Sequence, residues 1–431
     1  MLCYWYEFYT QDIDVECVRC VEKFLLQFVE LCGKLVRSNL QSAYADSSFN
    51  KGAFKHRKEV DYMKLRCTKE SLIDGINIVS KAVSARSTIA VIEGIHLKAM
   101  EENQLRLTGN DFEIGIECII DSQVEIAGEI VINAKMFGDI VRKLPEEAVD
   151  IELLDNNVTK IVSGKSKFEI PGIVATEFPE LPTFDSEYNI NIKKTNLKKM
   201  INNTIFSVGT NENKIALTGC LLETLGEQVR MVAVDGYRLA MRDEKLEREY
   251  EARSVIIPSK ALAELNKILK DGDEEIEINY TSRHAVFLFD NCKMVTRLIE
   301  SEYINYRQIM PKDSSIEVKC SVRELVNSIE RAALVNTSEN NKSPVKLKIA
   351  NDNINVSCQT GVGTVDDNIS AETGDCDIEI GFNHRFLLDA LHACEGEDVV
   401  LKMKESTAPC VIEPAEGNDY YYLILPMRLS N

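Results

Sequence analysis

One short segment of the sequence occurs three times at a constant spacing. The copies are residues 132–139, 257–264 and 382–389. Each copy has the same order of apolar, basic, apolar and acidic positions, and its basic residues, Lys135, Lys260 and Arg385, lie 125 residues apart in both intervals. A repeat of this period predicts three copies of one domain. A chain of 431 residues, 45% of them hydrophobic, is long enough and apolar enough for three cores.

Two helices are expected in each repeat, and they concentrate basic charge. The opening helices are predicted at residues 68–83, 193–209 and 321–336, and the later ones begin near Asn133, Pro258 and Asn383. These segments contain fifteen Lys and Arg against seven acidic residues, whereas the rest of the chain has 35 basic and 62 acidic residues. Any single helix could simply have a solvated basic face. Six biased helices in a chain of net charge −19 indicate a surface that attracts a polyanion.

Between the helices, apolar and polar residues alternate with a period of two. This pattern covers residues 105–108, 112–117, 149–153, 275–278, 345–349 and 377–380. It predicts strands with one solvated face. Turn signals are expected at Gly109-Asn110, at residues 155–157 and at residues 351–353, and proline-marked linkers at 179–185 and 311–315. The fold class is therefore α+β, with two helices on one face of antiparallel sheets in each repeat.

Membrane, metal and enzyme functions find little support in the sequence. No stretch approaches the roughly eighteen uncharged apolar residues of a membrane span. The thirteen cysteines lie mostly singly among apolar residues, which predicts a reducing cytoplasm, and Cys17 and Cys20 lack the second pair of a zinc site. Residues 163–166 resemble the end of a phosphate loop, but Thr159 occupies the position of its first glycine. No catalytic residue, cofactor or metal ligand is predicted.

Four motifs resemble one known family. They are Met63-Lys-Leu, Leu107-Thr-Gly-Asn-Asp-Phe-Glu, Val234-Asp-Gly-Tyr-Arg-Leu and Leu425-Pro-Met-Arg-Leu. With these motifs the chain resembles, over residues 63–429, the bacterial DNA sliding clamp, the β subunit of the replicative DNA polymerase III. The resemblance implies clamp domains at residues 63–182, 190–311 and 316–431 that dimerise head to tail into a ring. Residues 1–62 precede the start of the family and are expected to be a disordered extension or a wrongly assigned start.

The resemblance also implies three groups of site residues. The basic residues that face DNA are Arg86, Lys135, Arg142, Lys198, Lys199, Lys214 and Lys260. The cleft for partner peptides consists of Leu217, Val234, Gly236, Tyr237, Arg238, Leu239, Ile304, Ile309, Pro409, Leu423, Ile424, Leu425, Pro426, Met427, Arg428 and Leu429. The dimer seam contains Phe168, Ile170, Leu334 and Val335. The alternatives are solvated lysines, a buried last strand at 423–425 with Met427 and Leu429 more exposed, and a core position for the pair in the first repeat.

The implied function is that of a non-catalytic processivity factor for a DNA polymerase. Its partners would be double-stranded DNA without sequence preference, a second copy of the chain, the replicative polymerase, the clamp loader, repair polymerases and other proteins that carry a clamp-binding peptide ending in leucine and phenylalanine. No membrane partner is expected. The alternative is a peptide-binding scaffold that does not encircle DNA.

Overall fold

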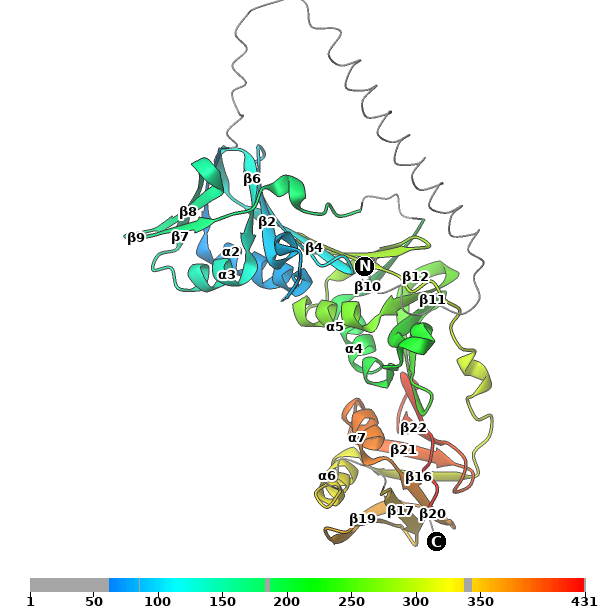
Figure 1. Ribbon diagram of the computed structural model, residues 1–431. Helices are drawn as coiled ribbons and strands as arrows, with labels where there is room; N and C mark the ends of the chain where they lie inside the picture. Colours follow the sequence, from blue (N-terminus) through cyan, green and yellow to red (C-terminus); the bar gives the residue numbers. More distant parts are fainter. Residues whose placement is uncertain (1–61, 85, 183–186, 337–342, 430–431) are drawn as a thin grey trace, which may run out of the picture. The chain divides into compact units, whose positions relative to one another are not determined.

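The computed structural model describes residues 62–84, 86–182, 187–336 and 343–429 (Figure 1). The predicted N-terminal extension, with Cys17 and Cys20, lies outside the described residues except for Tyr62. The elements of each repeat appear in the same order along the chain, as the 125-residue period predicts.

The first repeat places two capped helices beside a series of strands. Its helices are α2 (Lys69–Val79) and α3 (Ala134–Arg142). Its strands are β1 (Met63–Thr68), β2 (Gly94–Met100), β3 (Gln104–Asn110), β4 (Ile114–Asp121), β5 (Gln123–Ile126), β6 (Gly128–Asn133), β7 (Ala148–Leu154), β8 (Val158–Ser163) and β9 (Ser166–Pro171). The side chains of Thr68 and Asn133 accept hydrogen bonds from backbone N–H groups of the first turns, so both helices begin where a polar cap is available.

In the second repeat, two long strands each take the place of several shorter strands of the first repeat. Its helices are α4 (Lys194–Asn202) and α5 (Ser259–Ile268). Its strands are β10 (Tyr188–Lys193), β11 (Gly219–Val234), β12 (Arg238–Pro258), β13 (Glu275–Tyr280), β14 (His284–Phe289) and β15 (Cys292–Arg297). Pro258 precedes α5 directly, in agreement with the expected start of that helix.

The third repeat follows the same order. Its helices are α6 (Val322–Ala333) and α7 (His384–His392). Its strands are β16 (Ile316–Ser321), β17 (Val345–Ala350), β18 (Asn353–Gln359), β19 (Thr364–Glu372), β20 (Asp377–Phe382), β21 (Asp398–Met403), β22 (Cys410–Pro414) and β23 (Tyr420–Ile424). In each repeat the two helices contact one another, and Figure 1 shows α2 beside α3, α4 beside α5 and α6 beside α7.

Three sheets run through the described residues, and two of them cross from one repeat to the next. Their strand orders are β5-β1-β7-β8-β9, β10-β13-β14-β15-β4-β3-β2-β6 and β11-β12-β23-β22-β21-β16-β19-β18-β17-β20. At the first junction, β15 pairs antiparallel with β4, and at the second junction, β23 pairs antiparallel with β12. Neighbouring repeats are therefore joined edge to edge by main-chain hydrogen bonds.

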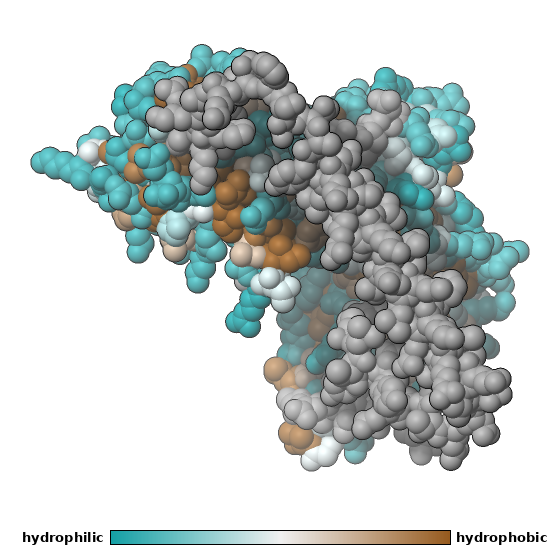
Figure 2. All heavy atoms as spheres, turned by 45° about the horizontal axis from the view of Figure 1, so that its top comes forward, coloured by the Kyte–Doolittle hydropathy of each residue, from teal (hydrophilic) through white to brown (hydrophobic). Residues whose placement is uncertain are grey.

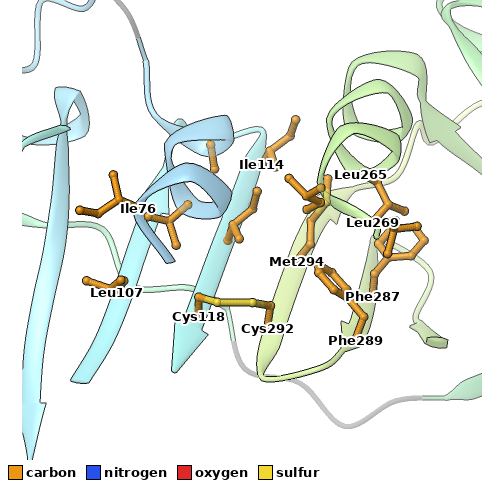
Figure 3. Packing of buried hydrophobic residues seen from close by; sticks show 14 of the residues in the cluster. Ile76, Leu107, Ile114, Cys118, Leu265, Leu269, Phe287, Phe289, Cys292 and Met294 are labelled. Carbon is orange, nitrogen blue, oxygen red and sulfur yellow. A yellow bond between two sulfur atoms is a disulfide. The ribbon is translucent and has the colours of Figure 1, made fainter. Parts of the chain in front are cut away.

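The apolar core is continuous across the first junction. Ile76 and Leu107 of the first repeat belong to the same buried cluster as Leu265 and Phe287 of the second (Figure 3). A second cluster lies around α6, α7 and the strands of the third repeat, and it includes Ala240 of β12 in the second repeat. The helices thus bury one face on the sheets and leave the other to solvent, which is the two-layer arrangement expected of an α+β domain.

A disulfide between Cys118 and Cys292 links β4 to β15 at the first junction (Figure 3). The two residues are directly opposite in the ladder, and their Cα atoms are 4.2 Å apart. Seven other described cysteines are free. The sequence interpretation treated the cysteines as single thiols in a reducing compartment and missed this pair, because residues separated by 174 positions meet only once the strand register is known.

One predicted turn lies in a different place. Gly109 and Asn110 belong to β3, and the chain turns immediately after them, where Asp111 N donates to Ile114 O at 3.1 Å. Phe112, in the middle of this turn, has a φ of +71°. The predicted strand at residues 112–117 consequently begins only at Ile114. The turn predicted at 351–353 is confirmed, since Asn351 and Asp352 both have positive φ.

Candidate functional site

The main candidate for partner docking is built around a tight turn between β11 and β12. Asp235 Oδ1 accepts hydrogen bonds from the backbone nitrogens of Tyr237 (2.8 Å) and Arg238 (3.1 Å). Gly236 has a φ of +97°, a conformation that residues with a Cβ rarely adopt. The turn therefore projects Tyr237 into solvent, where its side chain is 64% exposed.

Four exposed apolar side chains lie over a buried apolar floor in this region. The exposed residues are Tyr237, Ile304, Ile309 and Leu425, and the buried ones are Leu217, Val234, Leu239 and Leu423. The buried four belong to one cluster that also includes Tyr306 and Val411. We call these eight residues the docking surface. The face drawn in Figure 2 is mostly hydrophilic where it is coloured and is interrupted by a few apolar patches. Contiguous exposed apolar patches often mark interaction sites.

One pocket adjoins the docking surface, and a second contains another residue of the predicted cleft. A pocket of about 800 Å³ lies beside Ile304 and is also lined by Glu223, Tyr303 and Tyr306. Burial raises the pKa of Tyr306 to about 12, and its hydroxyl donates to Glu223 at 2.6 Å. A smaller pocket of about 240 Å³ contains the half-buried Pro409 together with three lysines.

Arg238 lies beneath the turn instead of on the docking surface. Its side chain is only 11% exposed. The guanidinium donates to Asp235 Oδ2 at 2.9 Å and to Asp389 Oδ2 of the third repeat at 2.6 Å. Arg238, which the resemblance assigns to the peptide cleft, therefore also links the second repeat to the third.

In the C-terminal tail, Met427 and Leu429 are less exposed than predicted. Leu423 and Ile424 are buried in β23, as the buried-strand alternative proposed, whereas Leu425 is exposed and donates its backbone N–H to Tyr237 O at 2.9 Å. Met427, expected to be exposed, is half-buried because its backbone pairs with Gly381. Leu429 is half-buried over the same glycine. Of the remaining tail residues, Pro426 is half-buried and Arg428 is exposed.

The seven predicted basic residues lie on or beside the helices, and most of them have acidic neighbours. Lys135 and Arg142 belong to α3, Lys198 and Lys199 to α4, and Lys260 to α5, whereas Arg86 follows α2 and Lys214 precedes β11. Ion pairs join Arg142 to Asp139, Lys198 to Asp271 and Lys199 to Glu395. Within the described part of the chain, Arg86, Lys135 and Lys214 have no ion pair. The positive charge of these helices is therefore partly compensated.

Lys260 crosses the first junction. Its Nζ lies 2.8 Å from Asp111 Oδ2 and 2.6 Å from Glu113 Oε2, both in the turn before β4. Although partial burial disfavours the charged amine, the two carboxylates raise the pKa of Lys260 above its ordinary value. This member of the repeated motif thus helps to hold the second repeat against the first.

The predicted seam residues divide into exposed and buried positions. Phe168 is exposed on β9, the last strand of its sheet, whereas Ile170 is buried in the core of the first repeat. Leu334 is 73% exposed at the end of α6, and Val335 beside it is half-buried. Val362, which the sequence interpretation missed, is 72% exposed in the turn before β19. Ile170 therefore fits the core alternative, and Val362 joins the exposed group.

The described residues show no phosphate loop, metal cluster or membrane-spanning helix. Residues 163–166 form the hairpin turn between β8 and β9, so no helix follows to bind a phosphate. The described residues contain no group of three or more His, Cys, Asp or Glu that could hold a metal ion. None of the described helices has the length and apolar content of a membrane span.

Comparisons with known proteins agree across nearly the whole described region. Models of the DNA polymerase III beta subunit match residues 63–182 (N-terminal domain), 191–305 (central domain) and 307–428 (C-terminal domain). The beta sliding clamps of Staphylococcus epidermidis and Bacillus subtilis are each 32% identical over 85% of this chain and cover 99% and 100% of their own lengths.

Solved structures show the same relationship. A putative DNA polymerase III beta subunit from Eubacterium rectale is 38% identical with a TM-score of 0.81, over 85% of this chain and 100% of that one. The DNA polymerase sliding clamp of Bacillus subtilis is 32% identical with a TM-score of 0.82, over 86% and 100% of the two chains. A Pseudomonas aeruginosa sliding clamp bound to griselimycin is 26% identical with a TM-score of 0.80, over 85% and 100%.

Proposed function

The chain belongs to the DNA polymerase III beta subunit family, the bacterial sliding clamps, and from this premise we propose that two copies form a ring around duplex DNA. The predicted family and the α+β class with repeated clamp domains are confirmed. The protein is a non-catalytic processivity factor of DNA replication. The boundaries 63–182, 190–311 and 316–431 remain our proposal for its domains.

The main support for the proposed ring is that the same kind of junction between repeats occurs more than once along the chain. At the first junction, a turn precedes β4, and Ile114 at the end of that turn is opposite Thr296 of β15. At the second, the corresponding turn precedes β12, and Arg238 is opposite Ile424 of β23. The same turn occurs a third time, where Thr360 N donates to Gly363 O at 3.0 Å directly before β19.

Within the described residues, the third copy of the junction has no partner strand. Among the described strands, β19 pairs with β18 along its length and with β16 only at Ala371 and Glu372. The strand equivalent to β15 and β23 in the first repeat is β9, which ends its sheet. Unpaired edges of this kind invite pairing with another chain. We propose that β9 of one copy pairs with β19 of the other.

The two existing junctions also predict the register of this pairing. The hairpins β8-β9 and β14-β15 align Ser166 with Cys292, so Ile170 takes the place of Thr296 and pairs with Gly363. Phe168 of one copy then lies opposite Val365 of the other, and Lys167 lies opposite Asp366. An aromatic side chain opposite a β-branched one and a pair of opposite charges are both favourable across strands.

A second copy closes the structure in this scheme. Each chain offers one β9 edge and one β19 edge, so two chains make two identical head-to-tail contacts. The exposed Leu334 and Val362 lie next to the β19 edge, since Thr360 Oγ1 donates to Val335 O at 2.7 Å. The ring would then contain six repeats, with two further junctions of the same kind as those inside each chain.

DNA is proposed to lie against the helices, where the basic residues predicted from the sequence are found. A ring holds DNA by its topology, so strong phosphate binding is not required. Each neutralised phosphate would add to affinity and to its dependence on salt. The ion pairs of Lys198, Lys199 and Lys260 limit that attraction. Contacts to the backbone alone would leave the ring indifferent to sequence.

The docking surface is proposed to bind short peptides that end in leucine and phenylalanine. Its exposed aliphatic and aromatic side chains suit such residues, and the main chain of Tyr237 and Leu425 is already paired. The replicative polymerase, the clamp loader, repair polymerases and other proteins with such a peptide are the proposed partners. A protein that encircles the bacterial chromosome would work in the cytoplasm.

The alternative is a scaffold that binds peptides as a single chain without enclosing DNA. It would use the same docking surface but would not need the β9 and β19 edges. The exposed apolar residues beside β19 favour the ring, because a monomer would leave Leu334 and Val362 in water.

Cysteines placed at one predicted pair should test the register. Ser166 and Asp367 are the equivalents of the disulfide-bonded Cys292 and Cys118, so the variant Ser166→Cys with Asp367→Cys is expected to form disulfides between copies. The measurement is a doubled mass on a denaturing gel without reductant. This mass should return to that of one chain after reduction.

The matched control is Lys167→Cys with Asp367→Cys. Lys167 is on the opposite face of β9 from Ser166, so this pair should remain largely uncrosslinked. Equal crosslinking of both variants, or none in either, would contradict the proposed register.

A further inference from the structure

The acidic position of the repeated motif has a different partner in each repeat. Asp139 accepts from Arg142 and Glu264 accepts from Lys267, in each case three residues away on the same helix. Asp389 on α7 instead accepts from Arg238 of the second repeat, 151 residues away. Only this copy of the acid reaches the turn of the docking surface.

Arg238 is enclosed on several sides. Besides its bonds to Asp235 and Asp389, its Nη2 donates to Phe206 O at 2.5 Å. The guanidinium carbon lies 4.5 Å from the ring centre of Phe386 and 5.5 Å from that of Phe206, within the range of a cation–π interaction. A guanidinium that is 11% exposed needs these partners, because burying a charge without compensation is unfavourable.

The same contacts determine how the turn is held. One oxygen of Asp235 accepts from the turn's backbone nitrogens and the other accepts from Arg238 Nε, so the guanidinium and the turn share a carboxylate. Tyr237, the exposed residue of the turn, stacks on Phe386 with ring centres 6.2 Å apart. Phe386 and Asp389 lie one helical turn apart on α7, so they reach the docking surface from the same face of that helix.

We propose that Asp389 and Phe386 are positioning residues of the docking surface, which act through Arg238 and Tyr237. This inference rests on the proposed peptide-binding function and adds that the third repeat preorganises the turn of the second. A surface already in its binding conformation loses less free energy to ordering when a peptide binds. Without the carboxylate of Asp389, Arg238 loses its ion pair with α7, and the turn gains conformations that must be given up on binding.

The test uses Asp389→Asn in the full-length chain and a fluorescent peptide ending in Leu-Phe. Asparagine keeps the size of the side chain and removes its charge. The dissociation constant of the peptide is expected to rise about tenfold, which corresponds to ~1.4 kcal/mol. Glu264→Gln and Asp139→Asn, the same position in the other repeats, are the matched controls and should bind as the unaltered chain does.

A double variant separates positioning from general loss of structure. If Asp389 acts through Arg238, then Asp389→Asn should add no further loss of affinity in an Arg238→Met background. Phe386→Leu keeps an apolar side chain but removes the ring that stacks on Tyr237, so it should lower the affinity for the peptide. The thermal midpoint and the oligomeric mass of this variant should stay close to those of the unaltered chain.

Two results would overturn the inference while leaving the proposed docking function in place. If folded Asp389→Asn binds the peptide as tightly as the unaltered chain, Asp389 has no positioning role, although the proposed docking function stands. Additive losses in the double variant would show that Asp389 acts independently of Arg238. If the unaltered chain does not bind the peptide at all, the docking function itself fails and this inference with it.

Discussion

Replacing Leu334 and Val362 by aspartate is expected to convert the proposed dimer into a monomer. The two side chains are 73% and 72% exposed in the single chain, so they contribute little to the fold of their own repeat. At the proposed third junction they would be covered by the other copy. A carboxylate buried there without a partner costs several kcal/mol, enough to reverse the association of an apolar seam. Sedimentation equilibrium measures the change directly.

The control for this experiment is Ile126→Asp. Ile126 is also an exposed apolar residue on a strand, but it lies on β5, away from the β9 and β19 edges. This variant should remain dimeric. A Leu334→Asp, Val362→Asp chain that still sediments as a dimer would place the seam elsewhere on the molecule.

Aspartate at Ile309 and Leu425 is expected to remove peptide binding while leaving the dimer intact. Both residues are exposed on the docking surface and are supplied by different segments of the chain. Fully burying one aliphatic side chain contributes about 1.5–3 kcal/mol, so losing two should raise the dissociation constant by roughly a hundredfold or more. Fluorescence anisotropy with the labelled Leu-Phe peptide provides the measurement.

Val174→Asp is the matched control for the docking surface. Val174 has an exposure similar to that of Leu425, but it follows Ile173, which pairs with Val131 of β6 in the first repeat. Its substitution should leave peptide affinity unchanged. Unaltered affinity in the Ile309→Asp, Leu425→Asp variant would show that peptides dock at another surface.

The repeated helices and most strands could be predicted from the sequence, because their signals are local. Asn133, Pro258 and Asn383 precede the later helices where the sequence interpretation expects them. The period-two alternation identifies strands for the same reason, since burial on one face of a sheet depends on neighbouring residues. The turn predicted at Gly109-Asn110 begins directly after these residues, and the side chain of Asn110 accepts a hydrogen bond from Phe112 N within it.

Long-range partners could not be predicted in the same way. The disulfide of Cys118 and Cys292 and the bond from Arg238 to Asp389 depend on strand register and on packing between repeats. Polarity alone suggests that Arg238 is a surface residue, whereas the structure surrounds it with carboxylates and aromatic rings. Met427 is half-buried for a similar reason, since its backbone pairs with Gly381 far away in the sequence.

Comparing the three repeats in the structure identifies further residues of the proposed dimer seam. The family resemblance implied Phe168 and Leu334, but it did not indicate Val362 or Val365. These residues emerge when the turns before β4, β12 and β19 are compared, because all three have the same main-chain hydrogen bond. The first two turns lead into junctions inside the chain, and the third leads to an open edge.

The crosslinked ring makes it possible to measure whether the protein encloses DNA. The Ser166→Cys, Asp367→Cys variant would be incubated with nicked circular DNA, oxidised, and washed in about 1 M NaCl, where charges are screened beyond about 3 Å. The protein is expected to stay on the circle through this wash and to be released when a restriction enzyme cuts the DNA. Loss of the protein from intact circles at the same salt concentration as from linear DNA would contradict enclosure of DNA by the ring.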